Sequence, residues 1–213
     1  MKTTFFILMM MVSVMLNAGN PEYEQAMGEA LKQYAACNST DEFRQAANRF
    51  TLIAQAENSE WLPLYYYAHC YIIMSFMEEE KDAAVRDALL DEAEESLIRA
   101  EKLAPDEDEI FALRGFVYTA RLVIDPMNRG QQYSALSEQM LGKALAIDPQ
   151  NPRAQYMQIA NQMGTASFFG QDISVYCTKA KELFEQWDQF PVDSALHPAW
   201  GKDQLSELMK SCK

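Results

Sequence analysis

The feature that most constrains the fold is a helix ending that occurs twice in the chain. Residues 97–110 read LIRAEKLAPDEDEI, and residues 141–154 read LGKALAIDPQNPRA, 44 positions later. In both segments an alanine follows the first leucine after three positions, and a proline follows that alanine after five more. Repetition at such a period is typical of a solenoid, in which each unit buries its apolar face against the neighbouring units.

The repeated pattern extends along most of the chain. Weaker copies of the same helix begin at Ala46 and Ala180. Four small residues, each followed by a large side chain three positions later, mark the helix that precedes each copy: Gly28, Ala68, Gly115 and Ala160. Over residues 21–191 the chain therefore resembles the tetratricopeptide-repeat (TPR) family, whose units are pairs of helices.

The last part of the chain carries a second resemblance. Residues 151–202 contain Asn151-Pro152-Arg153, Phe168-Phe169-Gly170 and Pro198-Ala199-Trp200-Gly201. These elements are similar to those of exported Bacteroidota-type TPR proteins, a group with no assigned activity. The resemblance therefore implies export and a repeat fold, but it implies no reaction.

Together these observations predict an all-α, tetratricopeptide-like helical-hairpin solenoid of about four helix pairs plus a C-terminal capping helix. The expected ranges are 21–58, 59–105, 106–149 and 150–191 for the repeats and 192–213 for the cap. The second and third pairs are longer than the family pattern, with the extra residues in 77–90 and 125–134. Either the helices are longer than usual, or loops project from one edge of the solenoid.

The first 18 residues have the layout of a secretory signal peptide. Lys2 precedes a twelve-residue apolar run, and the small residue Ala18 follows it. Such a run is short for a membrane span. We expect cleavage after Ala18, a single mature domain of residues 19–213 in the periplasm or outside the cell, and no stable membrane insertion after cleavage. The alternative is a short membrane anchor.

The charge of the chain excludes one class of partner. The net charge is −13, and the loss of Lys2 with the signal would make it more negative. A strongly acidic surface repels phosphate backbones, so nucleic-acid binding is excluded as a main role. The acidity serves solubility, or it favours a basic partner.

Four cysteines follow the signal segment, and an even number in an oxidising compartment permits disulfides. A bridge between Cys177 and Cys212 would tie a terminal helix to the repeats. The alternative is that all four cysteines are small buried side chains.

No arrangement typical of catalysis or of a metal site is present in the sequence. The two histidines, His69 and His197, lie far apart, and there is no HExxH, GxSxG or phosphate-binding glycine-rich loop. The acidic runs are typical of solvated helix faces and helix starts. We therefore expect no enzyme activity, no metal and no cofactor.

The resemblance implies that the first helix of each pair lines a concave, partner-binding face. Six residues occupy matching positions on these helices: Tyr65, His69, Ile72, Ile73, Phe116 and Asn161. This aromatic and apolar set would suit an apolar peptide or a helix of another protein. The competing interpretation is that the rings belong to the core between repeats.

Two functions are consistent with these features. The first is a non-enzymatic scaffold that binds a partner protein or peptide on the concave face. The alternative is a small-ligand receptor or an enzyme, with a pocket between the last helix pair and the C-terminal segment. The wall of that pocket would contain Phe168, Phe169, His197 and Trp200.

Overall fold

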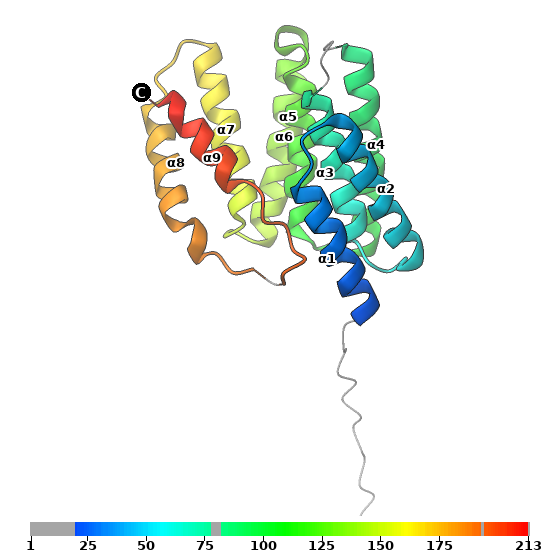
Figure 1. The fold of residues 1–213 in the computed structure, drawn as a ribbon. Helices are drawn as coiled ribbons and strands as arrows, with labels where there is room; N and C mark the ends of the chain where they lie inside the picture. Colours follow the sequence, from blue (N-terminus) through cyan, green and yellow to red (C-terminus); the bar gives the residue numbers. More distant parts are fainter. Residues whose placement is uncertain (1–19, 78–81, 193, 213) are drawn as a thin grey trace, which may run out of the picture.

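A computed structural model describes residues 20–77, 82–192 and 194–212, and the only regular secondary structure in this part of the chain is helical (Figure 1). The described residues contain nine α-helices and no strand. The helices are α1 (Pro21–Ala35), α2 (Thr40–Ala56), α3 (Leu62–Met77), α4 (Ala83–Leu103), α5 (Asp108–Leu122), α6 (Pro126–Ile147), α7 (Pro152–Phe168), α8 (Ser174–Gln186) and α9 (Lys202–Leu208). Two short 3₁₀ helices, Trp187–Gln189 and Met209–Ser211, follow α8 and α9.

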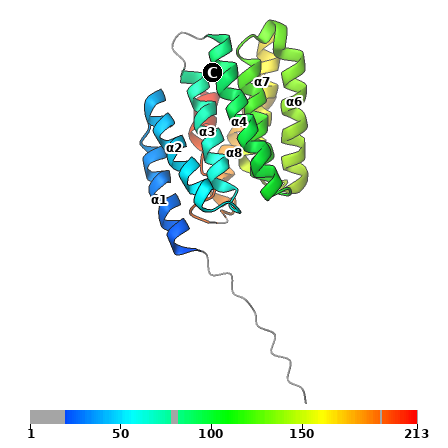
Figure 2. The ribbon, with the colours of Figure 1, turned by 90° about the vertical axis from the view of Figure 1, so that its right-hand side faces the viewer.

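Consecutive helices pack as pairs, and the pairs stack side by side (Figures 1 and 2). α2 also contacts α3, α4 contacts α5, and α6 contacts α7, so each pair is joined to the next. α3, α5 and α7 contact one another in turn and form what we call the inner layer. This arrangement confirms the predicted all-α, solenoid-like fold, while the division into family repeats stays a prediction.

The extra residues of the middle pairs lengthen helices. α4 has 21 residues and α6 has 22, and between them they include most of 77–90 and all but one residue of 125–134. Residues 78–81 lie outside the described part. In the described residues, extra helical turns therefore account for most of the additional length.

Polar side chains cap the starts of several helices. Ser39 accepts a hydrogen bond from the Glu42 amide, and the Glu42 carboxylate accepts one from the Ser39 amide, forming a capping box. Asn151 accepts from the Ala154 amide at the start of α7. These bonds satisfy amide groups that have no partner within the first turn of a helix.

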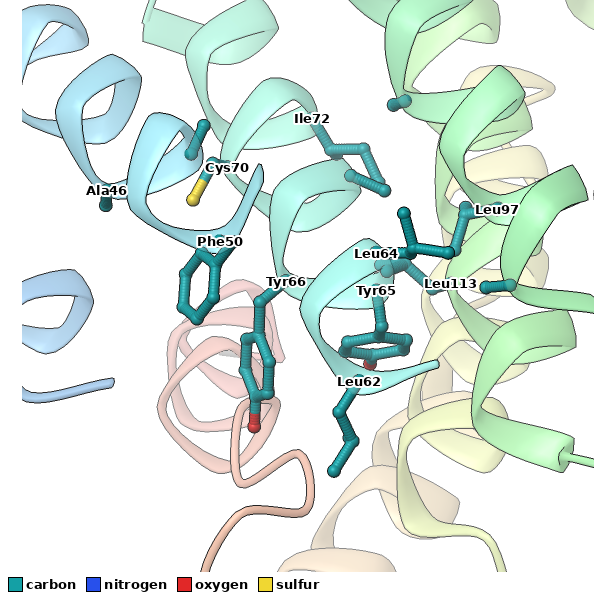
Figure 3. Close-up of a cluster of buried hydrophobic side chains, with 14 of the residues drawn as sticks. Ala46, Phe50, Leu62, Leu64, Tyr65, Tyr66, Cys70, Ile72, Leu97 and Leu113 are labelled. Carbon is teal, nitrogen blue, oxygen red and sulfur yellow. The ribbon is translucent and has the colours of Figure 1, made fainter. Parts of the chain in front are cut away.

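The repeated small and large residues form the contacts between helices. Figure 3 shows Ala46 and Phe50 of α2 beside Tyr66 of α3, and the rings of Phe50 and Tyr66 stack at 5.3 Å. Gly115 of α5 lies so close to Leu141 of α6 that an added Cβ would approach the leucine side chain to 2.7 Å. The small residue of the repeat therefore permits close packing of the helices within a pair.

The C-terminal segment lies against the inner layer. Residues 190–192 and 194–201, which we call the strap, lead from α8 back towards α3, where Tyr66 donates a hydrogen bond to the Leu196 carbonyl (2.9 Å). α9 then returns towards α8 (Figure 1), and its Leu205 is buried among side chains of α7 and α8. The expected capping helix therefore packs on the last pair, and the strap also reaches the second pair.

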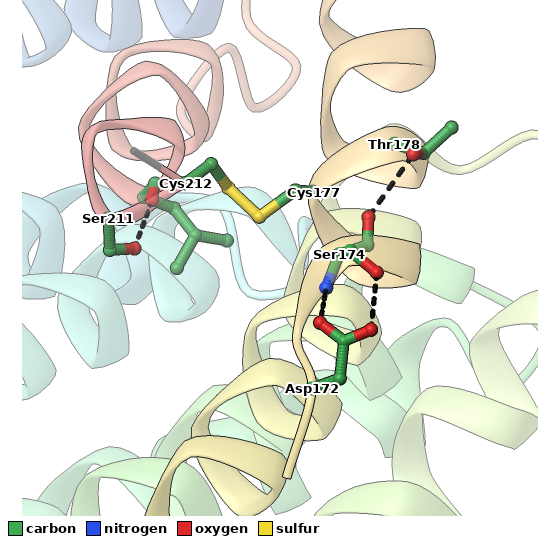
Figure 4. The surroundings of a disulfide bond; sticks show 7 residues. Asp172, Ser174, Cys177, Thr178, Ser211 and Cys212 are labelled. Atoms are coloured by element: carbon green, nitrogen blue, oxygen red, sulfur yellow. Dashed lines mark hydrogen bonds between the residues drawn. A yellow bond between two sulfur atoms is a disulfide. The ribbon is translucent and has the colours of Figure 1, made fainter. Parts of the chain in front are cut away.

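A disulfide ties the C-terminus to α8. The sulfur atoms of Cys177 and Cys212 are 2.13 Å apart, and Figure 4 shows the bridge between α8 and the end of the chain. Cys37 and Cys70 carry free thiols.

The expected signal peptide lies outside the described residues, and no helix within those residues is long and apolar enough to cross a membrane.

Candidate functional site

Four rings from three separate parts of the chain meet on the inner layer. His69 and Phe76 come from α3, Phe116 from α5 and Trp200 from the strap. The ring centroids are 5.5 Å apart for Phe76 and Phe116, 5.6 Å for Phe116 and Trp200, and 5.1 Å for Trp200 and His69. All three pairs are stacked, and we call these residues the ring cluster. Phe76 is 43% exposed, so the cluster reaches the surface.

His69 is the buried end of the ring cluster. Its side chain is 2% exposed, and its Nδ1 lies 2.6 Å from the Tyr34 hydroxyl. Its Nε2 is buried and has no hydrogen-bond partner among the described residues. Burial lowers the pKa of His69 to about 3, because an imidazolium loses its hydration there. His69 is therefore a neutral ring at physiological pH.

We expect the stability of the protein to fall as the pH drops from about 6.5 towards 3, because of His69. The unfolded state binds a proton near the ordinary pKa of 6.5, whereas the folded state binds it near 3. Urea unfolding at pH 7 and at pH 4.5 would measure the loss in the wild type and in His69→Gln. A loss of the same size in both proteins would contradict the assignment.

A buried ion pair between Glu109 and Arg153 lies beside the ring cluster. The Glu109 carboxylate accepts hydrogen bonds from Arg153 Nε (2.6 and 2.7 Å) and from the Asn151 amide (2.6 Å). The Tyr65 hydroxyl lies 3.4 Å from the same carboxylate and accepts a bond from Trp200 Nε1 at 2.7 Å. Burial raises the pKa of Glu109, and the bonds from Arg153 act in the opposite direction. A polar chain thus connects the indole to the ion pair.

Comparison with known proteins gives one informative match. No family model and no curated protein sequence matches the chain. Among solved structures, the HusA haemophore from Porphyromonas gingivalis is similar, with a TM-score of 0.77 and 33% identity. The match covers 90% of this chain and 92% of that one. The chain belongs to the HusA family. Because no family model matches, the resemblance to TPR proteins stays a prediction.

In this member of the HusA family, half of the predicted concave-face residues are core residues. Tyr65 and Ile72 are completely buried, and His69 is nearly so. Trp200 of the strap stacks on His69 and bonds to Tyr65, so the strap covers positions expected to face a partner. A partner-binding role for these three residues stays a prediction, and in this structure Tyr65 and His69 lie against Trp200 of the strap.

The other three predicted residues are half-buried: Ile73, Phe116 and Asn161. Phe116 belongs to the ring cluster. Asn161 bonds to Thr119 (3.0 Å) and to Ser137 (2.8 Å), which links α7 with α5 and α6. A role in binding a partner stays a prediction for these three residues.

The residues of the alternative pocket lie in different places. Trp200 is in the ring cluster, and His197 stacks edge-on against Trp61 at 5.6 Å. Phe168 and Phe169 lie at the end of α7, 55% and 67% exposed, and contact each other. A small hollow beside the strap is lined by Glu109, Arg153 and His197, among others, and has a polar wall.

Phe76 belongs to the ring cluster, although its place in the sequence did not mark it as a site residue. It follows His69 by seven positions, which places both on the same face of α3 after two turns. That spacing was available in the sequence, but the pairing of Phe76 with Phe116 was not.

In the described part of the chain, no cluster of three or more histidine, cysteine, aspartate or glutamate side chains could hold a metal ion.

Proposed function

We propose that this protein binds haem, or a porphyrin of the same shape, as an exported binding protein without enzyme activity. The observation that carries the proposal is the relation to the HusA haemophore, which extends over nearly the whole of both chains. A haemophore is a binding protein for a small flat ligand. This favours the small-ligand alternative over the partner-protein scaffold.

The ring cluster supports this proposal chemically. A porphyrin is a wide, flat aromatic system, and aromatic side chains bind such a surface by offset stacking. Phe76, Phe116 and Trp200 form a stacked series that begins at an exposed ring. Their planes differ by only 26–27° between neighbours, so a flat ligand that stacks on the exposed ring of Phe76 would continue the series.

Exposed apolar side chains extend this surface at the ends of the inner helices. α3, α5 and α7 run in the same direction, so their C-terminal ends lie at one edge of the inner layer. Phe76, Val123, Phe168 and Phe169 all lie there and are 41–67% exposed. The proposed ligand surface therefore lies towards this edge, rather than between the last pair and the C-terminal segment alone.

We expect the mature chain, residues 19–213, to bind haemin with a shift of the Soret absorbance, and Phe76→Ala to weaken binding. Loss of one stacked ring costs about 1 kcal/mol, which corresponds to roughly a fivefold increase in Kd. Titration with iron-free protoporphyrin separates ring stacking from binding through the iron. Similar affinities for both ligands would indicate that the rings dominate.

Leu52→Ala is the matched control for Phe76→Ala. Leu52 is 66% exposed on α2, an outer helix, so this variant also removes an exposed apolar side chain. Its affinity for haemin should equal that of the wild type. A wild-type protein that binds neither haemin nor protoporphyrin would refute the proposed function.

A further inference from the structure

Arg86 of α4 differs from the other arginines of the described chain. It is only 9% exposed, and its Nε donates a hydrogen bond to the Ser75 carbonyl at 2.8 Å. Among the described residues, no carboxylate pairs with it. Arg44 and Arg99 also have no such partner there, but both are exposed to water. The remaining arginines each pair with a carboxylate of the chain: Arg49, Arg114, Arg121, Arg129 and Arg153.

The terminal nitrogens of Arg86 are available to a second partner. The bond to Ser75 uses one of the five N–H groups that a guanidinium carries. The fully enclosed side-chain N and O atoms without a partner in the described residues are Tyr23 Oη, His69 Nε2 and Arg114 Nε. The terminal nitrogens of Arg86 are not among these atoms, so solvent reaches them. Arg86 is therefore held at Nε, and its other donors face an accessible space.

This guanidinium lies beside the exposed start of the ring cluster. Ser75, which it contacts, directly precedes Phe76 in the last turn of α3, and Phe76 is the exposed ring. Val85, the neighbour of Arg86 at the start of α4, is 44% exposed. α4 begins at the edge where α3 ends (Figure 1). A cation therefore lies next to the apolar groups of the proposed ligand surface.

The charge balance at this edge favours an anionic partner for Arg86. A largely enclosed charge has lost hydration, and an opposite charge offsets that loss. Haem and related porphyrins carry carboxylates on the rim of the ring. The net charge of −13 repels such a ligand unless a cation lies close to its carboxylates. A guanidinium can bind a carboxylate through two parallel N–H bonds, which the terminal nitrogens can supply.

We propose that Arg86 binds a carboxylate of the ligand, so that the site selects flat porphyrins that carry carboxylates on their rim. This inference rests on the proposed function and deepens it. The exposed rings bind the flat face of the ligand, and Arg86 binds its acidic rim. The selection acts on the carboxylate and does not depend on a metal at the centre of the ring.

Titration of the wild type with protoporphyrin and with its dimethyl ester tests this inference, because the two ligands have the same ring. Loss of the charged hydrogen bonds should make Kd about tenfold higher for the ester. Arg86→Met keeps an unbranched apolar side chain but removes the guanidinium. It should raise Kd for protoporphyrin about tenfold and leave Kd for the ester unchanged, so the ratio of the two falls to about one.

Arg99→Met is the matched control, because it removes an exposed arginine of the same helix. It should keep the wild-type ratio. If Arg86→Met weakens binding of both ligands by the same factor, Arg86 acts only through its bond to Ser75, and the inference is overturned. If Arg86→Met fails to fold, Arg86→Gln replaces it, since its neutral amide can still donate to Ser75. A ratio in Arg86→Gln as high as in the wild type would overturn the inference.

The wild-type titrations separate this inference from the proposed function. Equal or tighter binding of the ester overturns the role of Arg86, while porphyrin binding itself stands. Absence of binding to haemin, protoporphyrin and the ester alike overturns both.

Discussion

Replacing Arg153 with alanine is expected to lower the free energy of unfolding by about 3–5 kcal/mol. The substitution leaves the Glu109 carboxylate, whose side chain is 4% exposed, without its cationic partner. A buried charge has lost its hydration, and without an ion pair no attraction to an opposite charge offsets that loss. Asn151 and Tyr65 remain as neighbours, but neither carries a compensating charge.

Chemical denaturation of the single and double variants distinguishes loss of the pair from loss of packing. Glu109→Leu/Arg153→Met replaces both charges by apolar groups of similar size, and we expect it to be much closer to the wild type than Arg153→Ala. A double variant as unstable as Arg153→Ala would show that side-chain packing, rather than the unpaired carboxylate, causes the loss. Arg49→Ala is a control, because its ion pair with Glu29 is solvent-exposed and contributes little.

The repeated helices could be predicted because their signal is local and periodic. Leu97 and Leu141 occupy equivalent places in two helices and are both completely buried. The small residue Gly115 was recognisable because close packing within a pair permits nothing larger there. Glu109 and Arg153 have the same 44-residue spacing, but the repeat pattern consists of apolar and small residues and so does not indicate a charged pair.

The ring cluster could not be predicted, because one of its members comes from a segment without a period. Trp200 bonds to a residue 135 positions earlier in the chain. Spacing along a helix gives the face on which His69 and Phe76 lie, but it does not tell which segment will cover that face. The resemblance to TPR proteins did not indicate the strap either, because it implies an open concave face that no other segment covers.

The disulfide between Cys177 and Cys212 is the second interaction that we expect to contribute strongly to stability. Replacing Cys177 and Cys212 with serine should lower the free energy of unfolding by about 4 kcal/mol, because the bridge closes a long loop in the unfolded state. The two residues are separated by 35 positions, and the loop between them includes the strap and α9. For a domain of this size the midpoint of thermal unfolding should fall by roughly 10 °C.

Thermal unfolding with and without a dithiol reductant isolates this effect. The reductant should lower the midpoint of the wild type to that of the double serine variant and leave the variant itself unchanged. Cys37→Ser is the control, because Cys37 carries a free, half-buried thiol; it should keep the full response to the reductant. The bridge restrains the segment that carries Trp200, so the reduced protein should also bind haemin more weakly. A reduced protein with unchanged haemin affinity would show that the bond to Tyr65 suffices to hold the indole.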